Sequence, residues 1–214
     1  MTMKSTANNK EKENTNDKPV RILALHGKGG SSSDLEQKLS PLSNQLRDKI
    51  QIDYLNAPHE NGQWWLLPPG KRSFTADTYT GFDMSESLIN KVASDYDVLL
   101  GHSQGAILLI SLLSLNKINP KRIILNGVAW PNPFTKQLEE LQIDGDEMKI
   151  LFVTGRRDAI NPPDTQQRVK ESLMNVDGID VSTIFHDNGH GIPMNDDGAR
   201  DAIIDWITSN CFKV

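Results

Sequence analysis

Apolar and polar positions along the chain follow two patterns in turn, and these patterns predict alternating strands and helices. Short, nearly continuous apolar runs are typical of strands that are buried on both faces of a sheet. We expect strands at 20–25, 50–55, 97–101, 122–125, 149–153 and 181–185. Helical spacing of apolar residues predicts helices at 33–48, 84–95, 104–115, 164–174 and 197–209. This alternation predicts an α/β fold, with a mostly parallel sheet of about six strands and helices on both faces.

Capping signals and a proline mark two of the predicted helices. Ser33 followed by Glu36 predicts a capping box at the start of the helix after the first strand. Asp164 followed by Gln167 predicts a second capping box, directly after two prolines. Pro41 lies inside the first of these helices, where its missing amide and its ring predict a kink or a break.

The length of 214 residues suits one domain with a full core and is short for two. Residues 1–18 are almost free of apolar side chains, so we interpret them as a disordered tail before one domain over 19–214. The tail explains part of the low apolar content, which is 37% compared with ~45–50% in average domains. Residues 56–82 lack clear periodicity, and connections of that length are usually functional or disordered. Whether they act as a lid stays open, and we expect no large cap domain.

Charge and cysteine content exclude several classes of protein. A net charge of −5 is unfavourable for binding nucleic acid or anionic membranes through bulk charge. No apolar run reaches the ~18 residues that a membrane span needs, and the N-terminal segment lacks the apolar core of a secretory signal. The single Cys211 excludes an internal disulfide and a cysteine-rich zinc site. We therefore expect a cytoplasmic protein, whose oligomeric state the sequence does not reveal.

The segment Gly101–Gly105 carries the strongest chemical signal. Its residues, Gly-His-Ser-Gln-Gly, match the G-x-S-x-G pattern between a strand and a buried helix. In that context the serine occupies a sharp, strained turn, and the flanking glycines remove Cβ atoms that would collide with neighbouring elements. Ser103 is therefore the candidate nucleophile. The alternative is that Ser103 only caps the helix and that the glycines serve packing.

A serine hydroxyl needs a base, and in α/β-hydrolases an acid and then a histidine follow the serine along the chain. His190, between two glycines, is the candidate base, whereas His186 closes a strand pattern and is interpreted as structural. A metal shared by these two histidines is disfavoured, because the glycines oppose the helix that this spacing requires. Asp158 follows a strand and is the candidate acid. Asp164 is explained as a cap, and Asp187 lies too near His190 in sequence.

Acyl transfer also needs two backbone amides that hold the developing oxyanion. One should come from Gln104, the residue after the candidate nucleophile. The other should come from the turn after the first strand, where Lys28 is the candidate and Gly29 is the next choice.

Tryptophans are candidate substrate contacts. Trp64 and Trp65, in the long irregular segment, suit the wall of an apolar substrate pocket. Trp130, which follows the strand at 122–125, is a further candidate. The alternative interpretation is that these rings fill core beneath a long loop.

The turn at 27–32 has a second interpretation, as a dinucleotide-binding loop. It follows a strand and precedes a helix, as a G-x-G-x-x-G loop does, with Ser32 in place of the third glycine. Asp53 would then be the acid that binds the ribose, although it lies inside its strand. This interpretation leaves the candidate serine, aspartate and histidine unexplained.

With these motifs identified, the chain from about residue 19 to 210 resembles the family-of-serine-hydrolases group of small α/β-hydrolases. The resemblance is carried by Leu25-His26-Gly27, Asn56-Ala57-Pro58-His59 with Trp64-Trp65, Leu100–Ala106, Gly155–Asp158 with Pro162, and His186–Pro193. His102 and Asn188 stand where Phe and Gly are usual, and the turn at Lys28 is not the commonest form, so substrate preference does not carry over. The resemblance implies an α/β-hydrolase fold and carboxylesterase-like activity.

We therefore expect a serine hydrolase that cleaves a small-molecule acyl ester through an acyl-enzyme and needs no metal or organic cofactor. Acyl thioesters stay open as substrates, because thioesterases share the same nucleophile turn. Two other classes also stay open, namely a catalytically silent α/β-hydrolase fold that binds a ligand and a dinucleotide-dependent enzyme.

Overall fold

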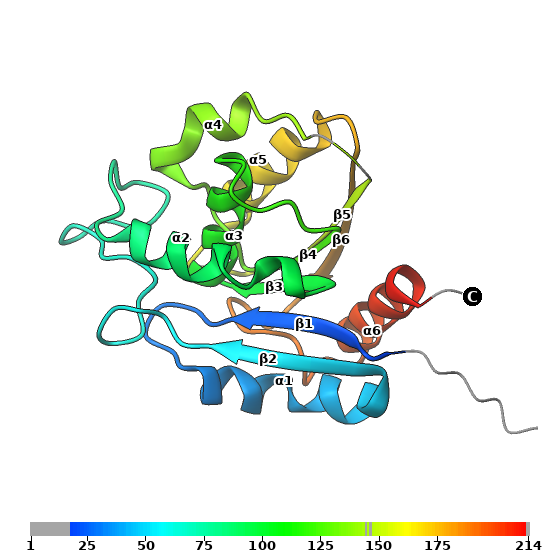
Figure 1. Cartoon of the computed structure of the whole chain (residues 1–214). Coiled ribbons are helices and arrows are strands. Elements are labelled where there is room, and N and C mark those ends of the chain that lie inside the picture. Colours follow the sequence, from blue (N-terminus) through cyan, green and yellow to red (C-terminus); the bar gives the residue numbers. More distant parts are fainter. Residues whose placement is uncertain (1–17, 144, 146, 213–214) are drawn as a thin grey trace, which may run out of the picture.

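The computed structural model describes residues 18–143, 145 and 147–212, which form a parallel sheet between two layers of helices (Figure 1). The strands are β1 (Val20–Leu25), β2 (Ile50–Leu55), β3 (Val98–His102), β4 (Arg122–Asn126), β5 (Met148–Gly155) and β6 (Ile179–His186). The helices are α1 (Ser32–Leu46), α2 (Phe82–Asn90), α3 (Gln104–Ser114), α4 (Thr135–Glu139), α5 (Pro163–Met174) and α6 (Asp197–Cys211). The predicted tail lies outside the described residues, apart from Lys18.

The strands are arranged in the order β2-β1-β3-β4-β5-β6, and every neighbouring pair is parallel. The register aligns the carboxyl ends of the strands: Leu25 lies opposite Gly101, and His102 lies opposite Asn126. The loops that leave the strands therefore meet along one edge of the sheet, which is where α/β proteins bind ligands. The prediction of a parallel sheet of about six strands is confirmed.

Side chains of each strand alternate between two cores. Leu23, Leu99 and Phe152 pack with residues of α2, α3, α4 and α5 on one face of the sheet. Ile22 and Leu100 pack with residues of α1 and α6 on the other face. Figure 1 shows this division, with α1 and α6 on one side of the sheet and α3, α4 and α5 on the other. Burial on both faces explains why the strands are nearly continuous apolar runs.

The start of α1 differs from the prediction. Ser31, and not Ser33, is the N-cap, and its Oγ accepts a hydrogen bond from the Asp34 amide at 3.1 Å. Pro41 does not break the helix, which continues to Leu46. The carbonyl of Gln37, which would have received the missing amide of Pro41, accepts a hydrogen bond from Ser40 Oγ at 2.9 Å instead. Of the two outcomes predicted for Pro41, a kink or a break, the break is wrong, and a neighbouring hydroxyl supplies the Gln37 carbonyl with a donor.

Other helix boundaries also shifted. The predicted capping box of α5 was wrong, because the helix begins at Pro163 and its cap residue, Pro162, has no side-chain donor or acceptor. The predicted helix at 84–95 is divided into α2 and a short 3-10 turn at Ala93–Asp95. The short helix α4 lies in a region where the sequence pattern predicted none. Within the described residues, no helix combines the length and hydrophobicity that a bilayer crossing needs.

Candidate active site

Ser103 lies in the turn between β3 and α3, at the carboxyl edge of the sheet. Its backbone has φ 54° and ψ −116°, which is costly for a residue with a side chain. A Cβ on Gly101 would lie 2.5 Å from Ala106 Cα, and one on Gly105 would lie 2.5 Å from the Leu25 carbonyl oxygen. Both glycines are therefore required by the close approach of strand and helix. Ser103 is the N-cap residue of α3 by position, but its side chain makes no capping hydrogen bond, so capping does not explain its hydroxyl.

Ser103, His190 and Asp158 lie in one hydrogen-bonded row. Ser103 Oγ and His190 Nε2 are 2.8 Å apart, and His190 Nδ1 and Asp158 Oδ2 are 2.7 Å apart. A carboxylate can only accept, so the ring proton sits on Nδ1 and Nε2 is left to accept the serine proton. The His190 side chain is 20% exposed and that of Asp158 is fully buried. The row therefore runs from the interior to a surface that a substrate can reach.

The loop after β5 surrounds the Asp158 carboxylate with donors. Asp158 Oδ1 accepts hydrogen bonds from the amides of Ile160 and Asn161, each at 2.9 Å. Burial alone would raise the pKa of Asp158, but the hydrogen bonds from His190 and from these two amides outweigh it and hold the pKa below its usual value. The carboxylate is therefore charged at neutral pH and can stabilise a protonated imidazole beside it.

His102 is the last residue of β3 and directly precedes the candidate nucleophile. Its ring is 5.2 Å from that of His190, between centroids, and its Nδ1 accepts a hydrogen bond from Asn126 Nδ2 at 2.9 Å. Burial lowers the pKa of His102 to about 3, with a smaller contribution from the positive charge that His190 can carry. His102 is therefore neutral at neutral pH.

His26, at the end of β1, organises the backbone around the site. Its Nδ1 donates to the Gly27 carbonyl at 2.8 Å, and its Nε2 accepts from the Ala57 amide at 3.1 Å. Burial lowers the pKa of His26, despite the opposing effect of its bond to Gly27. The neutral ring therefore joins the turn after β1 to the first residues after β2.

The turn Gly27–Gly30 lies beside the candidate nucleophile. A Cβ built on Gly27 would lie 3.1 Å from Ser103 Cβ. The Gly29 amide donates to the Gly62 carbonyl at 2.8 Å, and the Gly30 amide donates to the Gly27 carbonyl at 3.1 Å. The Lys28 amide, by contrast, has no acceptor among the described residues. Of the two amides that the sequence suggested for this turn, only that of Lys28 is available to a substrate.

The Gln104 side chain joins the nucleophile turn to the long loop at 56–82. Its Oε1 accepts from the Trp64 amide at 2.9 Å, and its Nε2 donates to the Trp65 carbonyl at 3.0 Å. Trp64 Nε1 donates to the His26 carbonyl at 2.8 Å. The loop is thus attached to both turns that flank the site, and the sequence pattern did not reveal this role of Gln104.

The three candidate tryptophans lie in the core. Trp64 and Trp65 are fully buried, and the Trp65 ring stacks on Tyr79 with centroids 4.3 Å apart. Trp130 is 2% exposed, beneath the guanidinium of Arg168, which lies 3.6 Å from the ring centroid. The three rings therefore fill the core, as the alternative interpretation holds. None of them presents an open face to a substrate.

Residues 15–202 match the model of the serine hydrolase (FSH1) family. The chain belongs to this family. Esterase OVCA2 of Danio rerio is 25% identical over 211 aligned residues, which cover 82% of this chain and 91% of that protein. As a serine hydrolase of this family the chain is an enzyme, and esterase activity is the activity in the relative's name.

Solved structures show the same fold at low sequence identity. Esterase PE8 superposes with a TM-score of 0.71 at 20% identity, over 89% of this chain and 92% of its own. The Bacillus cereus carboxylesterase superposes with a TM-score of 0.67 at 20% identity, over 90% of this chain and 89% of its own. Zea mays acyl-protein thioesterase 2 superposes with a TM-score of 0.62 at 16% identity, over 90% of this chain and 94% of its own. The predicted α/β-hydrolase fold without a large cap domain is confirmed.

The dinucleotide interpretation does not fit this serine hydrolase. The Asp53 carboxylate accepts hydrogen bonds from Tyr96 Oη at 2.9 Å and from Arg21 and Gln51, so it is held within the sheet. The Ser32 amide, in the first turn of α1, donates to Asn56 Oδ1 at 2.8 Å. The Asp53 carboxylate therefore serves contacts within the sheet, and the Ser32 amide at the start of α1 is already engaged.

The paired-histidine alternative also finds no support among the described residues, which contain no group of three or more His, Cys, Asp or Glu that could hold a metal. His186 is buried at the end of β6, and its Nδ1 accepts from the Asn188 amide at 3.2 Å. Both ring nitrogens of His190 are engaged with Ser103 and Asp158.

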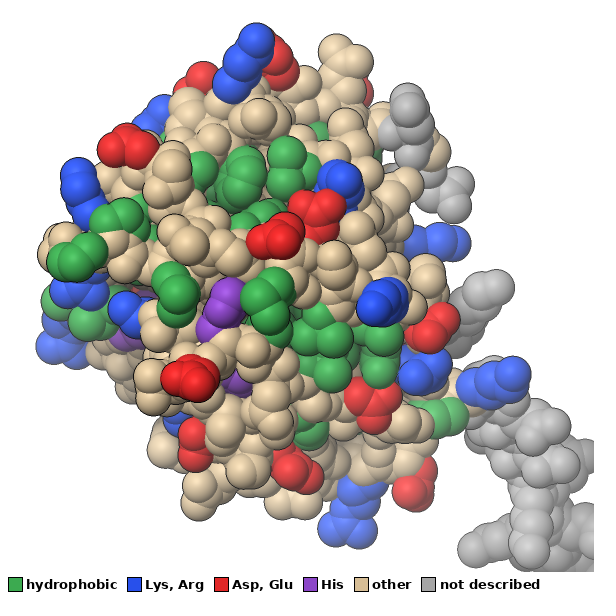
Figure 2. Space-filling model, turned by 60° about the vertical axis from the view of Figure 1, so that its left-hand side comes forward, with side chains coloured by type: hydrophobic (Ala, Val, Ile, Leu, Met, Phe, Trp, Pro, Cys, Tyr) green, Lys and Arg blue, Asp and Glu red, His purple; other side chains and the backbone are tan. Residues whose placement is uncertain are grey.

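The turn after β1 borders a small cavity, and two loops carry exposed hydrophobic side chains. A cavity of about 190 Å³ is lined by the turn Gly27–Gly30, by His26 and His102, and by Asp34, Leu35 and Lys38 of α1. Leu66 and Ile160 are exposed large hydrophobic residues of the two loops beside the site. In Figure 2 a histidine reaches the surface near the middle of this face, with hydrophobic side chains on both sides.

Sequence reasoning missed Gln166, a residue of α5 that contacts Asp158. Gln166, Val169 and Leu173 are the buried residues of that helix. A glutamine in line with the apolar stripe of a helix is a signal in itself, because a buried amide needs partners. Here Gln166 Nε2 lies 3.2 Å from Asp158 Oδ2.

Proposed function

We propose that this serine hydrolase cleaves carboxylic esters through a covalent acyl-enzyme on Ser103. His190 acts as the general base, and Asp158 holds the imidazole and stabilises its protonated form. The observation that supports the proposal best is the row of distances, 2.8 Å from Ser103 Oγ to His190 Nε2 and 2.7 Å from His190 Nδ1 to Asp158 Oδ2.

The reaction takes two steps. Ser103 Oγ forms a bond to the ester carbonyl carbon while His190 Nε2 takes the hydroxyl proton. The bond to the alcohol oxygen then breaks, and the alcohol leaves with the proton from His190. In the second step a water molecule gives a proton to His190 and attacks the acyl-enzyme, so that the acid is released and Ser103 regains its proton.

The amides of Lys28 and Gln104 are the proposed oxyanion donors. Gln104 is the first residue of α3, so its amide is among those that lack a partner within the helix. The Lys28 amide is without an acceptor among the described residues. Two such donors stabilise the charge that develops on the carbonyl oxygen in the transition state.

The proposed substrate is a small-molecule ester whose acyl part contacts the exposed Leu66 and Ile160. Thioesters remain a second candidate, because the same attack on a carbonyl carbon would release a thiol. The fold likeness to an acyl-protein thioesterase keeps this candidate open. Initial rates on matched esters and thioesters of increasing acyl length would separate the two.

The function is tested with a fluorophosphonate probe and with p-nitrophenyl esters. We expect the probe to label Ser103, and the Ser103→Ala variant to lose labelling and about 10⁴-fold or more of its turnover while staying folded. Circular dichroism and thermal unfolding serve as the folding control. A Ser103→Ala variant that keeps its activity would overturn the proposal, and an unlabelled native protein would favour a silent ligand-binding fold.

A further inference from the structure

The Asp158 carboxylate has one side-chain donor besides His190 among the described residues. Its Oδ1 is held by two backbone amides of its own loop, those of Ile160 and Asn161. Its Oδ2, the oxygen that faces His190, also accepts from Gln166 Nε2 at 3.2 Å. The backbone therefore fixes one oxygen, and the side chain of α5 restrains the other.

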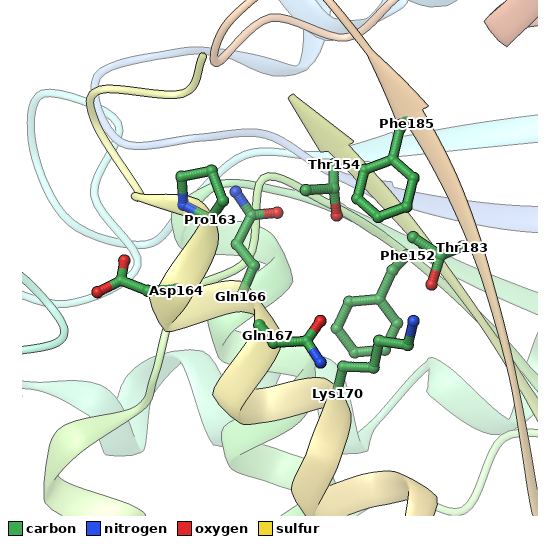
Figure 3. A pocket seen from close by; sticks show the side chains of 9 residues that line it. All are labelled: Phe152, Thr154, Pro163, Asp164, Gln166, Gln167, Lys170, Thr183 and Phe185. Atoms are coloured by element: carbon green, nitrogen blue, oxygen red, sulfur yellow. The ribbon is translucent and has the colours of Figure 1, made fainter. Parts of the chain in front are cut away.

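The acceptors around Gln166 determine how its amide is turned. Nε2 donates both to Asp158 Oδ2 and to the Asn161 carbonyl, the latter at 2.8 Å. Turning the amide over would place Oε1 against a carboxylate and a carbonyl oxygen, and all three groups can only accept. Figure 3 shows Gln166 extending from α5 between Pro163 and Thr154.

The other end of the amide is not satisfied in the same way. Gln166 is 2% exposed, and its Oε1 has no donor among the described residues. Gln166 borders a cavity of about 290 Å³ between α5 and strands β5 and β6. A buried amide with an unpaired oxygen lowers stability. The hydrogen bonds that Nε2 donates to Asp158 and Asn161 are therefore what accounts for a glutamine in the apolar stripe of α5.

We propose that Gln166 is a positioning residue that keeps Asp158 Oδ2 in line with His190 Nδ1. The proposal rests on the proposed function of Ser103, His190 and Asp158. Without the amide, Oδ2 would be held only by the His190 ring that it has to orient, because the backbone amides hold Oδ1, and the carboxylate would be freer to turn about its side-chain bond. The imidazole would then lose its alignment with Ser103 Oγ, although Gln166 itself touches neither the nucleophile nor the substrate.

The same contacts extend toward the ring of His190. Asn161, whose carbonyl accepts from Gln166, donates through Nδ2 to the Gly127 carbonyl at 2.7 Å. A Cβ on Gly127 would lie 3.1 Å from His190 Cε1. Gln166 thus joins α5 to the loop that carries Asp158 and, through Asn161, to the backbone beside the imidazole.

The pH profile distinguishes positioning from a purely structural role. An Asp158 Oδ2 that is out of line with His190 Nδ1 gives less support to the protonated imidazole. Removing the Gln166 donor should therefore move the acidic limb of kcat/KM to lower pH. A change that only loosened the fold would reduce the amount of active enzyme and leave the position of this limb unchanged.

The test compares Gln166→Met with Gln167→Met, its neighbour on the same helix. Gln167 is exposed, and its amide contacts only Glu171 among the described residues. We expect Gln166→Met to lower kcat by about 10–100-fold, the scale of a small misalignment of reacting groups, with KM within about twofold. We expect Gln167→Met to match the native enzyme in kcat and in pH profile.

Gln166→Glu supplies a conservative variant with its own signature. At neutral pH a second carboxylate would face Asp158, and protonation on acidification would restore an O–H donor. Its activity relative to the native enzyme should therefore rise as the pH falls. Native kcat and an unshifted acidic limb in Gln166→Met, with activity lost only in proportion to folded protein, would overturn the proposal.

One measurement does not depend on hydrolysis. The proton on His190 Nδ1, hydrogen-bonded to Asp158, should give a low-field NMR resonance that broadens or shifts in Gln166→Met and not in Gln167→Met. An unchanged resonance would count against positioning. If Ser103→Ala proved active while this resonance still responded, the proposed function would fail and the contact of Gln166 with Asp158 would stand.

Discussion

At the scale of single residues, the site depends on a backbone conformation that its central residue disfavours. Ser103 has φ 54° and ψ −116°, a combination suited to glycine. The Ser103 amide donates to the Asn126 carbonyl at 2.9 Å, and the Ser103 carbonyl accepts from the Ile107 amide at 3.0 Å. Contacts with two neighbouring elements therefore impose the strain, which lifts the hydroxyl toward His190.

Relief of this strain is measurable. We expect Ser103→Gly to abolish hydrolysis and yet to raise Tm, because the strain at such a position is about 1–3 kcal/mol and exceeds the entropic cost of glycine, about 0.5–1 kcal/mol. For a domain of this size, each kcal/mol gained corresponds to about 2–4 °C in Tm. Ser103→Ala keeps a Cβ and serves as the control. Equal Tm values for the two variants would contradict the idea that the turn is strained.

At the scale of elements, β1 and α3 approach each other too closely for a side chain at Gly105. Gly198, at the equivalent second position of α6, has no such neighbour: its nearest atom to an added Cβ is Asp196 Oδ1, at 3.6 Å. The second position of α3 therefore requires glycine, whereas the second position of α6 has room for a side chain. Gly105 is required because the carbonyl of Leu25, the last residue of β1, lies against it.

The two glycines give a matched pair of variants. We expect Gly105→Ala to destabilise the protein by about 1–3 kcal/mol through overpacking, and to lower activity because the turn must move. Gly198→Ala should be neutral or stabilising by up to about 1 kcal/mol, from helix propensity. Urea unfolding midpoints measure both. Destabilisation by Gly198→Ala equal to that of Gly105→Ala would show that the close approach is not the cause.

At the scale of the whole molecule, buried neutral histidines make stability depend on pH. The pKa of His26, His102 and His186 is lowered by burial, and for His102 it falls to about 3. An unfolded histidine has a pKa near ~6.5, so between ~6.5 and about 3 the unfolded chain binds a proton that folded His102 does not. The free energy of unfolding therefore decreases as the pH falls through this window.

His102→Phe tests this dependence. The variant removes one titrating ring, so its free energy of unfolding should fall less between pH 7 and pH 5 than that of the native protein, by about 1–2 kcal/mol. The difference between the two pH dependences is the quantity to compare, because the variant also loses the contact with Asn126. Parallel pH dependences would show that His102 is not held neutral by the fold.

Most of the framework follows from short stretches of sequence. Apolar runs predicted the strands because a strand buried on both faces has no polar side, and the glycines around Ser103 predicted the turn because the collision is local. The order of serine, aspartate and histidine along the chain singled out Asp158 and His190, and the structure brings all three side chains together. Their catalytic roles remain predictions that the variants above can test.

Contacts between distant segments account for what the patterns could not predict. Trp64 and Trp65 are core residues because the loop at 56–82 folds back onto Gln104, and no local pattern distinguishes a buried indole from one that lines a pocket. The Gly29 amide is engaged by Gly62, 33 positions away in the chain, whereas the Lys28 amide has no acceptor among the described residues. Local sequence thus determined the elements and the strained turn, whereas packing between remote segments determined which polar groups are paired and which face a substrate.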